Sequence, residues 1–223
     1  MKYKAIIFDM DGVLIDSEPV YLQEVIDYIR DDLKIKMNYY ELKKKLFKIV
    51  GLSDKKAYEI ISECLDYQYT ASEIQKGLQE KQDELHYNTI LNPHILNILP
   101  KLKSKGYKLA IASSSPLDNI QRVIKECQIN KYFDYIVSGC DFKESKPDPA
   151  IYLNVLNKLQ LNANQVIAIE DSTYGIQACK NANVKVIAKK DTRFGFEQYL
   201  ADEIADDMLE VYNIIETLNN SNS

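Results

Sequence analysis

Short, continuously apolar runs recur along this chain, and most of them end at a carboxylate or hydroxyl residue. They cover residues 5–8, 109–112, 135–137, 166–169 and 184–188. Strands that are buried on both faces of a parallel sheet are apolar throughout, whereas half-exposed strands alternate, so these runs predict parallel strands. Apolar residues at helical spacing between the later runs, as in 120–127 and 151–159, predict connecting helices. The chain is therefore expected to form an α/β fold with a Rossmann-like, three-layer core around a parallel sheet.

A long helical segment separates the first apolar run from the second. No further run of this kind occurs between Phe8 and Tyr107, and the apolar residues of 20–87 recur at helical spacing. We therefore expect an α-helical cap domain inserted after the first strand. The expected boundaries are 1–16 and 90–218 for the α/β core, 17–89 for the cap, and 219–223 for a disordered tail. Pro19 and Pro93 interrupt the two linkers, near residues 16–19 and 88–93, which are expected to act as a hinge.

The net charge argues against some classes of binding partner, and the cysteines indicate the cellular compartment. Lys and Arg number 28 and Asp and Glu number 33, so the formal net charge is −5 and no general positive field attracts nucleic acid or an anionic membrane. The four cysteines are far apart and form no CxxC pair, which favours reduced thiols. The apolar stretch at the start of the chain covers only residues 5–8, which fits neither a signal peptide nor a membrane span. A cytoplasmic protein, monomeric or weakly dimeric, is expected.

Polar side chains follow the apolar runs at the edge where an open α/β sheet binds its ligands. Asp9 and Asp11 follow the first run and point the same way while the chain stays extended. The other members of this predicted cluster are the serines after the second run, a lysine near a predicted helix and two acids after the fourth run: Ser113, Ser114, Ser115, Lys146, Glu170 and Asp171. Four carboxylates are thus expected at one edge of the sheet.

Such a cluster needs a compensating charge. Two unit charges ~4 Å apart repel by about 4 kcal/mol at an effective dielectric constant near 20. Carboxylate and carbonyl oxygens without His or Cys favour a hard cation, and Mg²⁺ is the usual one where the ligand is a phosphate. A lysine and a hydroxyl-bearing turn opposite the cation would hold phosphate oxygens. One carboxylate would then act as nucleophile and one as proton carrier.

Four segments in order along the chain resemble the motifs of the haloacid dehalogenase superfamily of phosphotransferases. Residues 8–13 contain Asp-x-Asp-Gly, and the second, third and fourth motifs are matched by residues 112–115, 145–148 and 169–172. The resemblance covers nearly the whole chain. The helical insertion after Asp16 resembles the cap of the subgroup that contains β-phosphoglucomutase and sugar phosphatases.

The resemblance implies a role for each matching residue. Asp9 would become phosphorylated, and Asp11 would serve as general acid and base and give its backbone carbonyl to Mg²⁺. Glu170 and Asp171 would complete the metal shell, and the phosphoryl group would be held by Ser113, Ser114 and Lys146. Residues proposed to contact the rest of the substrate are Gly51, Ser53, Lys81 and Ser115.

A Mg²⁺-dependent phosphatase is the expected function. It would act through an aspartyl phosphate on a small phosphorylated metabolite, a sugar phosphate, with neither nucleic acid nor membrane as partner. The alternative is β-phosphoglucomutase, which places a basic residue after a Gly-x-Ser turn and a Lys after the second-motif serines. Here Asp54 and Pro116 occupy these positions, although Lys55, Lys56 or Lys81 could replace the missing anchors.

Two further alternatives remain open. The cap does not exclude an inorganic pyrophosphatase. A non-enzymatic phospho-acceptor module also combines acids, a hydroxyl and a lysine at a sheet edge, but such modules lack a helical insertion and carry the acceptor after a middle strand. Asp9 and Asp11 follow the first strand, which argues against that alternative.

Overall fold

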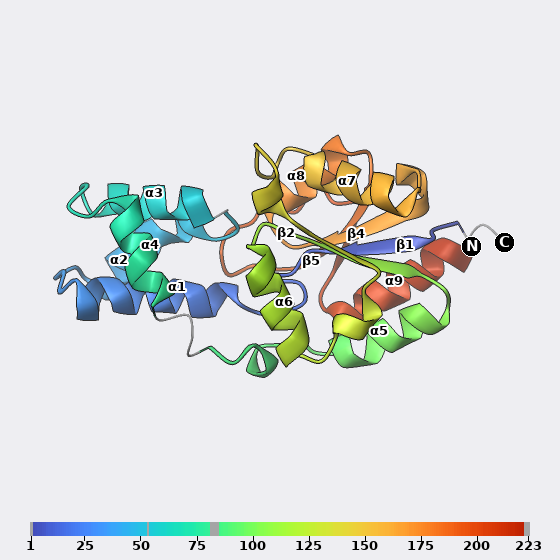
Figure 1. Cartoon of the computed structure of the whole chain (residues 1–223), viewed down its shortest axis with the longest axis horizontal. Coiled ribbons are helices and arrows are strands. Elements are labelled where there is room, and N and C mark those ends of the chain that lie inside the picture. Colours follow the sequence, from blue (N-terminus) through green and yellow to red (C-terminus); the bar gives the residue numbers. More distant parts are fainter. Residues whose placement is uncertain (1, 53, 81–84, 221–223) are drawn as a thin grey trace. The chain divides into compact units, whose positions relative to one another are not determined.

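A computed structural model describes residues 2–52, 54–80 and 85–220, with the main chain but not the side chain of Asp54. Within them, six strands form one parallel sheet in the order β3-β2-β1-β4-β5-β6 (Figure 1). The strands are β1 (Ala5–Phe8), β2 (Lys108–Ser113), β3 (Tyr135–Ser138), β4 (Val166–Glu170), β5 (Lys185–Lys189) and β6 (Glu203–Ala205). The chain winds from β1 to one side and then returns to β4 on the other side. The carboxyl end of β1 is therefore the switch point at which open α/β sheets bind ligands.

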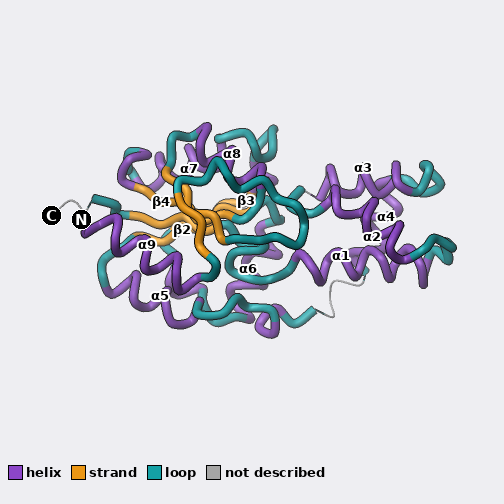
Figure 2. Tube along the Cα trace, turned by 180° about the vertical axis from the view of Figure 1, so that it is seen from behind, coloured by secondary structure: helices purple, strands orange, loops and turns teal. Residues whose placement is uncertain are grey.

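Helices cover both faces of the sheet (Figures 1 and 2). One face carries α7 (Ala150–Leu159) and α8 (Thr173–Asn181), and the other carries α5 (Ile95–Ser104), α6 (Leu117–Glu126) and α9 (Met208–Asn220). Ala5 and Ile7 of β1 pack in the cluster that contains the buried residues of α7 and α8. Because successive strand residues point to opposite faces, Ile6 and Phe8 serve the other layer. The predicted three-layer α/β core is confirmed.

Residues 17–86 form a compact helical unit of their own. Its helices are α1 (Glu18–Asp27), continued by a π-helical turn at Tyr28–Asp32, then α2 (Tyr39–Leu46), α3 (Asp54–Cys64) and α4 (Ala71–Gln79). A capping box at Thr70 and Glu73 starts α4. Apolar residues at helical spacing fill its core, including Ile26, Leu42, Leu46, Ile61 and Ile74.

Two boundaries differ from the sequence expectation. The helical unit ends at His86 rather than at residue 89, because Tyr87 belongs to the core unit. Its side chain is buried, its backbone N–H donates to Glu126 at 3.0 Å, and its hydroxyl donates to Asn119 at 2.7 Å. The expected tail also begins too early. Helix α9 continues to Asn220, and Asn219 accepts a hydrogen bond from the Tyr3 N–H at 2.9 Å, whereas 221–223 lie outside the described residues.

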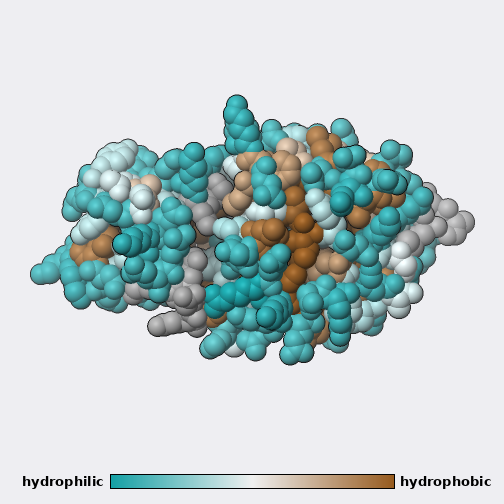
Figure 3. Space-filling view, in the orientation of Figure 1, coloured by the Kyte–Doolittle hydropathy of each residue, from teal (hydrophilic) through white to brown (hydrophobic). Residues whose placement is uncertain are grey.

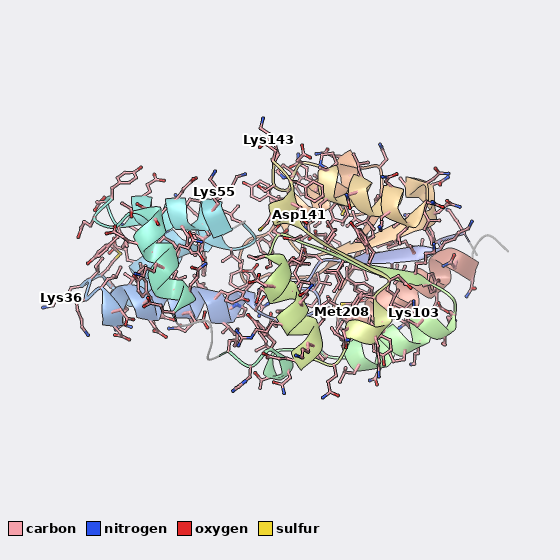
Figure 4. All side chains as sticks on the ribbon, in the orientation of Figure 1. Lys36, Lys55, Lys103, Asp141, Lys143 and Met208 are labelled. Atoms are coloured by element: carbon pink, nitrogen blue, oxygen red, sulfur yellow. The ribbon has the colours of Figure 1, made fainter. Side chains whose placement is uncertain are left out.

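The surface carries charged side chains that are often paired locally. The view in Figure 3 is mainly hydrophilic, with hydrophobic residues gathered in a strip over the core unit. Lys103, labelled in Figure 4, binds both carboxylate oxygens of Asp134, at 2.9 and 2.7 Å. No helix in the described part of the chain is long and apolar enough to cross a membrane.

Candidate active site

The acids predicted at the sheet edge come from the carboxyl ends of two neighbouring strands. Phe8 of β1 lies beside Ile169 of β4, so Asp9, just after β1, and Glu170, the last residue of β4, lie at the same level at the edge of the sheet. The N–H of Asp9 donates to the Ile169 carbonyl at 2.9 Å and extends the pairing by one residue. Both carboxylates are buried, and so is that of Asp171. The topology therefore produces this group from residues that are far apart in the chain.

Lys146 joins the two strand ends through its ammonium group. Nζ lies 2.6 Å from Asp9 Oδ1, 2.6 Å from Glu170 Oε1 and 3.1 Å from the Ala112 carbonyl. An ammonium has three protons, and these contacts give it three acceptors. Its side chain is only 8% exposed, so the pairing takes place away from bulk water.

Burial and charge change the protonation behaviour of this pair. Burial, and after it the negative charge of Glu170, raises the pKa of Asp9 well above its ordinary value, although Lys146 opposes the change. Burial alone would lower the pKa of Lys146, but the charges of Asp9 and Glu170 outweigh it and hold the pKa above its ordinary value. Lys146 is therefore charged, and the buried carboxylates of Asp9 and Glu170 share its one positive charge.

The donor set fits a hard divalent cation. One carboxylate oxygen each from Asp9, Glu170 and Asp171 lies within 4.8 Å of the others, with no His or Cys in this group. Oε2 of Glu170 is buried and has no hydrogen-bond partner among the described residues. A buried carboxylate oxygen without a donor is costly unless a cation faces it. All-oxygen ligands favour Mg²⁺ or a similar ion.

Two glycines leave room for these carboxylates. A Cβ atom built on Gly175 would lie 2.0 Å from Glu170 Oε2, and one on Gly12 would lie 1.8 Å from Asp171 Oδ2. Gly12 also has φ +77°, in the left-handed region that favours glycine. Any larger residue at either position would push a carboxylate out of the cluster.

Asp11 and the serines form a second, adjacent set of contacts. The Ser115 hydroxyl donates to Asp11 Oδ2 at 2.7 Å, while the Ser115 N–H donates to Ser113 Oγ at 3.1 Å. Ser113 is buried at the end of β2, and the Ser114 carbonyl accepts a weak bond from the Cys140 thiol at 3.7 Å. The Asp11 carboxylate is not part of the acidic group around Glu170. Metal binding through the Asp11 carbonyl stays a prediction.

Two residues of the site were not predicted from the sequence. Tyr152, on α7, is fully buried, and its hydroxyl donates to Glu170 Oε1. Ser138, at the end of β3, donates from its hydroxyl to the Ser115 carbonyl at 2.7 Å and accepts from the Cys140 N–H at 3.1 Å. Tyr152 lies among apolar residues at helical spacing, which predicts a packing role in the core. A buried tyrosine hydroxyl needs a hydrogen-bond partner, so its nearness to Lys146 in the sequence was the one indication that it belongs to the site.

The cap residues proposed for substrate contact remain untested. Gly51 lies in a turn of the helical unit, with φ +76°. Ser53 and Lys81 lie outside the described residues.

Comparisons with known proteins agree on one family. A family model described as haloacid dehalogenase-like hydrolase matches residues 6–189. The phosphorylated carbohydrates phosphatase of Thermotoga maritima is 34% identical over 185 residues, covering 82% of this chain and 83% of that protein. The pyrophosphatase PpaX of Bacillus velezensis is 29% identical over 213 residues, covering 92% and 91%. The solved β-phosphoglucomutase of Clostridium difficile has a TM-score of 0.77 at 24% identity and covers 98% of both chains, which shows likeness of fold alone.

The matched region contains the buried acidic cluster, Lys146 and both glycines that accommodate the carboxylates. The resemblance stated from the four motifs is confirmed, as is the expectation of an enzyme. The chain belongs to the haloacid dehalogenase-like hydrolase family and is an enzyme of its phosphohydrolase and phosphotransferase type.

Proposed function

We propose that this enzyme is a Mg²⁺-dependent phosphatase that forms an aspartyl phosphate on Asp9 and acts on a small phosphorylated metabolite, a sugar phosphate. The observation that carries the proposal is the 2.6 Å contact between Lys146 Nζ and Asp9 Oδ1 within a buried acidic group. A carboxylate fixed beside an ammonium can receive a phosphoryl group, because the ammonium offsets the negative charge that develops.

The reaction has two halves that use Asp9 and Asp11 differently. In the first, a carboxylate oxygen of Asp9 forms a bond to phosphorus, the bond from phosphorus to the substrate oxygen breaks, and Asp11 gives that oxygen a proton. In the second, Asp11 takes a proton from water, the water oxygen bonds to phosphorus, and the bond to Asp9 breaks. Inorganic phosphate leaves and both side chains return to their starting states.

The remaining residues bind and orient. Asp9, Glu170 and Asp171 would hold Mg²⁺, together with the Asp11 carbonyl. When bound, the cation neutralises charge on the phosphoryl oxygens and orients them for in-line attack. Lys146, Ser113 and Ser114 would bind the phosphoryl group. The Ser115 hydroxyl, 2.7 Å from Asp11 Oδ2, holds the proton-transferring carboxyl group.

Two observations rank the substrates. The relative at 34% identity is named for phosphorylated carbohydrates, which supports a sugar phosphate. Pyrophosphate is the second candidate, because a relative at 29% identity over 92% of this chain is a pyrophosphatase. The mutase alternative is weaker, since Pro116 and Asp54 stand where its phosphate anchors are expected, and Pro116 is the N-cap residue of α6.

The test is phosphate release from p-nitrophenyl phosphate, sugar phosphates, nucleotides and pyrophosphate, with Mg²⁺ and with EDTA. We expect turnover only with Mg²⁺, fastest on a sugar phosphate, and none by Asp9→Asn. Full turnover in EDTA, or by Asp9→Asn, would overturn the proposed mechanism. If pyrophosphate is the best substrate, the second candidate replaces the first.

Two lysines of one loop provide a matched pair of variants for the same assay. Lys146→Met should lower kcat by roughly 10² to 10³, the usual effect of removing one group that stabilises developing charge. Lys143 extends into solvent from that loop (Figure 4), so Lys143→Met should retain wild-type activity. Equal losses in the two variants would remove Lys146 from its role.

Hydrolase and mutase are separated by a second assay. The protein is incubated with Mg²⁺, β-glucose 1-phosphate and a trace of glucose 1,6-bisphosphate, and both inorganic phosphate and glucose 6-phosphate are followed. Net hydrolysis is expected. Glucose 6-phosphate formed much faster than phosphate would favour the mutase and would direct attention to Lys55, Lys56 or Lys81 as anchors.

A further inference from the structure

Tyr152 contacts both partners of the buried ion pair, yet it has no part in the reaction described above. The side chain is fully buried, and its hydroxyl donates to Glu170 Oε1. Its ring centroid lies 5.4 Å from Lys146 Nζ, close enough for a cation–π contact. The rest of the ring packs in the cluster between the sheet and helices α7 and α8. Tyr152 thus fills a core position, and its hydroxyl reaches the acidic group from the layer of α7 and α8.

The two oxygens of Glu170 have different surroundings. Oε1 accepts from Lys146 Nζ at 2.6 Å and from the Tyr152 hydroxyl. Oε2 has no hydrogen-bond partner among the described residues. The Gly175 backbone lies against both oxygens, because a Cβ there would be 2.0 Å from Oε2 and 2.3 Å from Oε1, so the hydrogen bonds alone distinguish them. With both donors on Oε1, the carboxylate is held in one rotational position. Oε2 is then the oxygen available to a cation.

We propose that Tyr152 is a positioning residue that fixes the Glu170 carboxylate so that Oε2 faces the cation. The inference rests on the proposed function, because it assigns the residue a task at the same metal site. Without the Tyr152 hydroxyl, Oε1 keeps a single donor, and the carboxylate can rotate to share Lys146 between its two oxygens. Loss of such an outer partner of a metal ligand typically lowers metal affinity about 10-fold to 100-fold.

The test is Tyr152→Phe, which removes the hydroxyl and keeps the ring in its core position. Binding of Mn²⁺, used as a paramagnetic probe of the site, is measured by electron paramagnetic resonance without substrate, and Mg²⁺ is titrated in competition. The dissociation constants of both ions should rise by about 10-fold to 100-fold. The kcat at saturating Mg²⁺ should fall by a smaller factor than the affinity for Mg²⁺, since saturating Mg²⁺ refills the site and the hydroxyl contacts Glu170 rather than Asp9 or Asp11.

Tyr135→Phe is the matched control. The hydroxyl of Tyr135, on β3, donates at 2.7 Å to Asn154, which lies on α7 as Tyr152 does. Tyr135 lies outside the acidic group. This variant also loses one tyrosine hydrogen bond to a side chain and should bind Mn²⁺ with wild-type affinity. A loss of affinity equal to that of Tyr152→Phe would mean that both variants act through general destabilisation, which would overturn the inference.

A double-mutant cycle with Glu170→Gln tests whether Tyr152 acts through Glu170. In the Glu170→Gln background, Tyr152→Phe should change the Mn²⁺ dissociation constant less than two-fold. An unchanged affinity in the single variant, an equal loss in both backgrounds, or no saturable Mn²⁺ binding by the wild type would each overturn the proposal. Because binding is measured without turnover, a wild type that binds Mn²⁺ but hydrolyses no phosphate ester would contradict the proposed function alone.

Discussion

Asp9 and Asp11 are two residues apart, yet their carboxylates have different partners. Asp9 is buried against Lys146, and burial followed by the charge of Glu170 raises its pKa. Asp11 accepts a hydrogen bond from the Ser115 hydroxyl. One environment holds a nucleophile in a charged group, whereas the other holds a carboxyl group beside a hydroxyl that can follow a change in its protonation. We therefore expect the two acids to fail in different ways when each is replaced by its amide.

Asp11→Asn should slow phosphoryl transfer from a sugar phosphate by roughly 10² to 10⁴, the usual contribution of general acid catalysis. With p-nitrophenyl phosphate the loss should shrink, because that leaving group departs without a proton. Phosphoenzyme should then accumulate, since water is no longer deprotonated. Single-turnover quench experiments on both substrates measure these rates. Equal losses on the two leaving groups would show that Asp11 has another role.

Single residues also mark how far the sequence could predict the site. Asp9 and Glu170 were identified as acids at the ends of apolar runs, and parallel strands bring such residues to one edge. Lys146 was identified as a lysine near a predicted helix at that edge. Tyr152 could not be separated from core packing, because a tyrosine on an apolar helix face has the same spacing as its packed neighbours. Ser138 was missed for the opposite reason: a serine after a short run resembles an ordinary turn residue, and its contact with Ser115 depends on how two loops fold.

The turn from β4 into α8 joins catalysis to helix geometry. Glu170 ends the strand, the Ser172 side chain accepts from the Gly175 N–H at 3.1 Å, and Gly175 lies in the first turn of the helix. The same turn that caps the helix thus brings the Gly175 backbone against the Glu170 carboxylate. A side chain at position 175 would overlap the space that the Glu170 carboxylate occupies.

Gly175→Ala is expected to destabilise the protein, against the usual effect of the substitution. Gly→Ala within a helix ordinarily stabilises by up to about 1 kcal/mol. Here the new Cβ would lie 2.0 Å from a carboxylate oxygen that Lys146 and Tyr152 hold in place. We expect a loss of roughly 1–3 kcal/mol in the free energy of unfolding, as for overpacked sites. Urea unfolding followed by circular dichroism, which needs no Trp, measures it; a gain in stability would contradict the clash.

The segment between β5 and β6 was not predicted, although it anchors the first linker. Arg193 binds both oxygens of Asp16, at 2.9 and 2.6 Å, and also binds the buried Asp191. Strand β6 is only three residues long, at the sheet edge, with two exposed residues, so it lacks the apolar run that identified the other strands. The pairing of Arg193 with a residue 177 positions away has no local pattern in the sequence.

Asp16→Asn should lower stability at neutral pH and have no effect in strong acid. The hydrogen bond from Arg193 lowers the pKa of Asp16 below its ordinary value, so the pair stabilises the fold above the unfolded pKa and loses this effect as pH falls through the folded pKa. The carboxylate is partly exposed, so we expect only about 1 kcal/mol at low salt. Urea unfolding at pH 7 and in acid checks the sign. Asp206→Asn, which breaks the exposed pair with Lys190, should have little effect at either pH.

At the scale of the whole molecule, a helical unit of 70 residues is inserted without interrupting the core. The two chain segments that lead to it are paired on the core side: the Asp16 N–H donates to the Ile90 carbonyl at 2.7 Å, and the Asn92 N–H donates to the Leu14 carbonyl at 2.9 Å. The Asn92 side chain also donates to the Gly12 and Val13 carbonyls, at 3.1 and 2.8 Å. The second linker is thus hydrogen-bonded to the loop that carries Asp11, so both linkers leave the core from one pair of hydrogen-bonded segments.

The pairing of these two segments determines where rotation of the helical unit should occur. We expect closure over a bound phosphate to exclude water until the leaving group is seated. The turning points should be Ser17, within the expected segment 16–19, and His86 rather than the expected segment 88–93, because Ile90 and Asn92 are hydrogen-bonded to the first linker. The Asp16–Ile90 and Leu14–Asn92 pairs should be unchanged, because breaking them would leave main-chain groups without their hydrogen bonds. Crystal structures without ligand and with Mg²⁺ and orthovanadate, superimposed on residues 2–16 and 87–220, would measure the rotation. A helical unit in the same position in both structures would contradict closure, and a rotation that separates Asp16 from Ile90 would place the hinge inside the core.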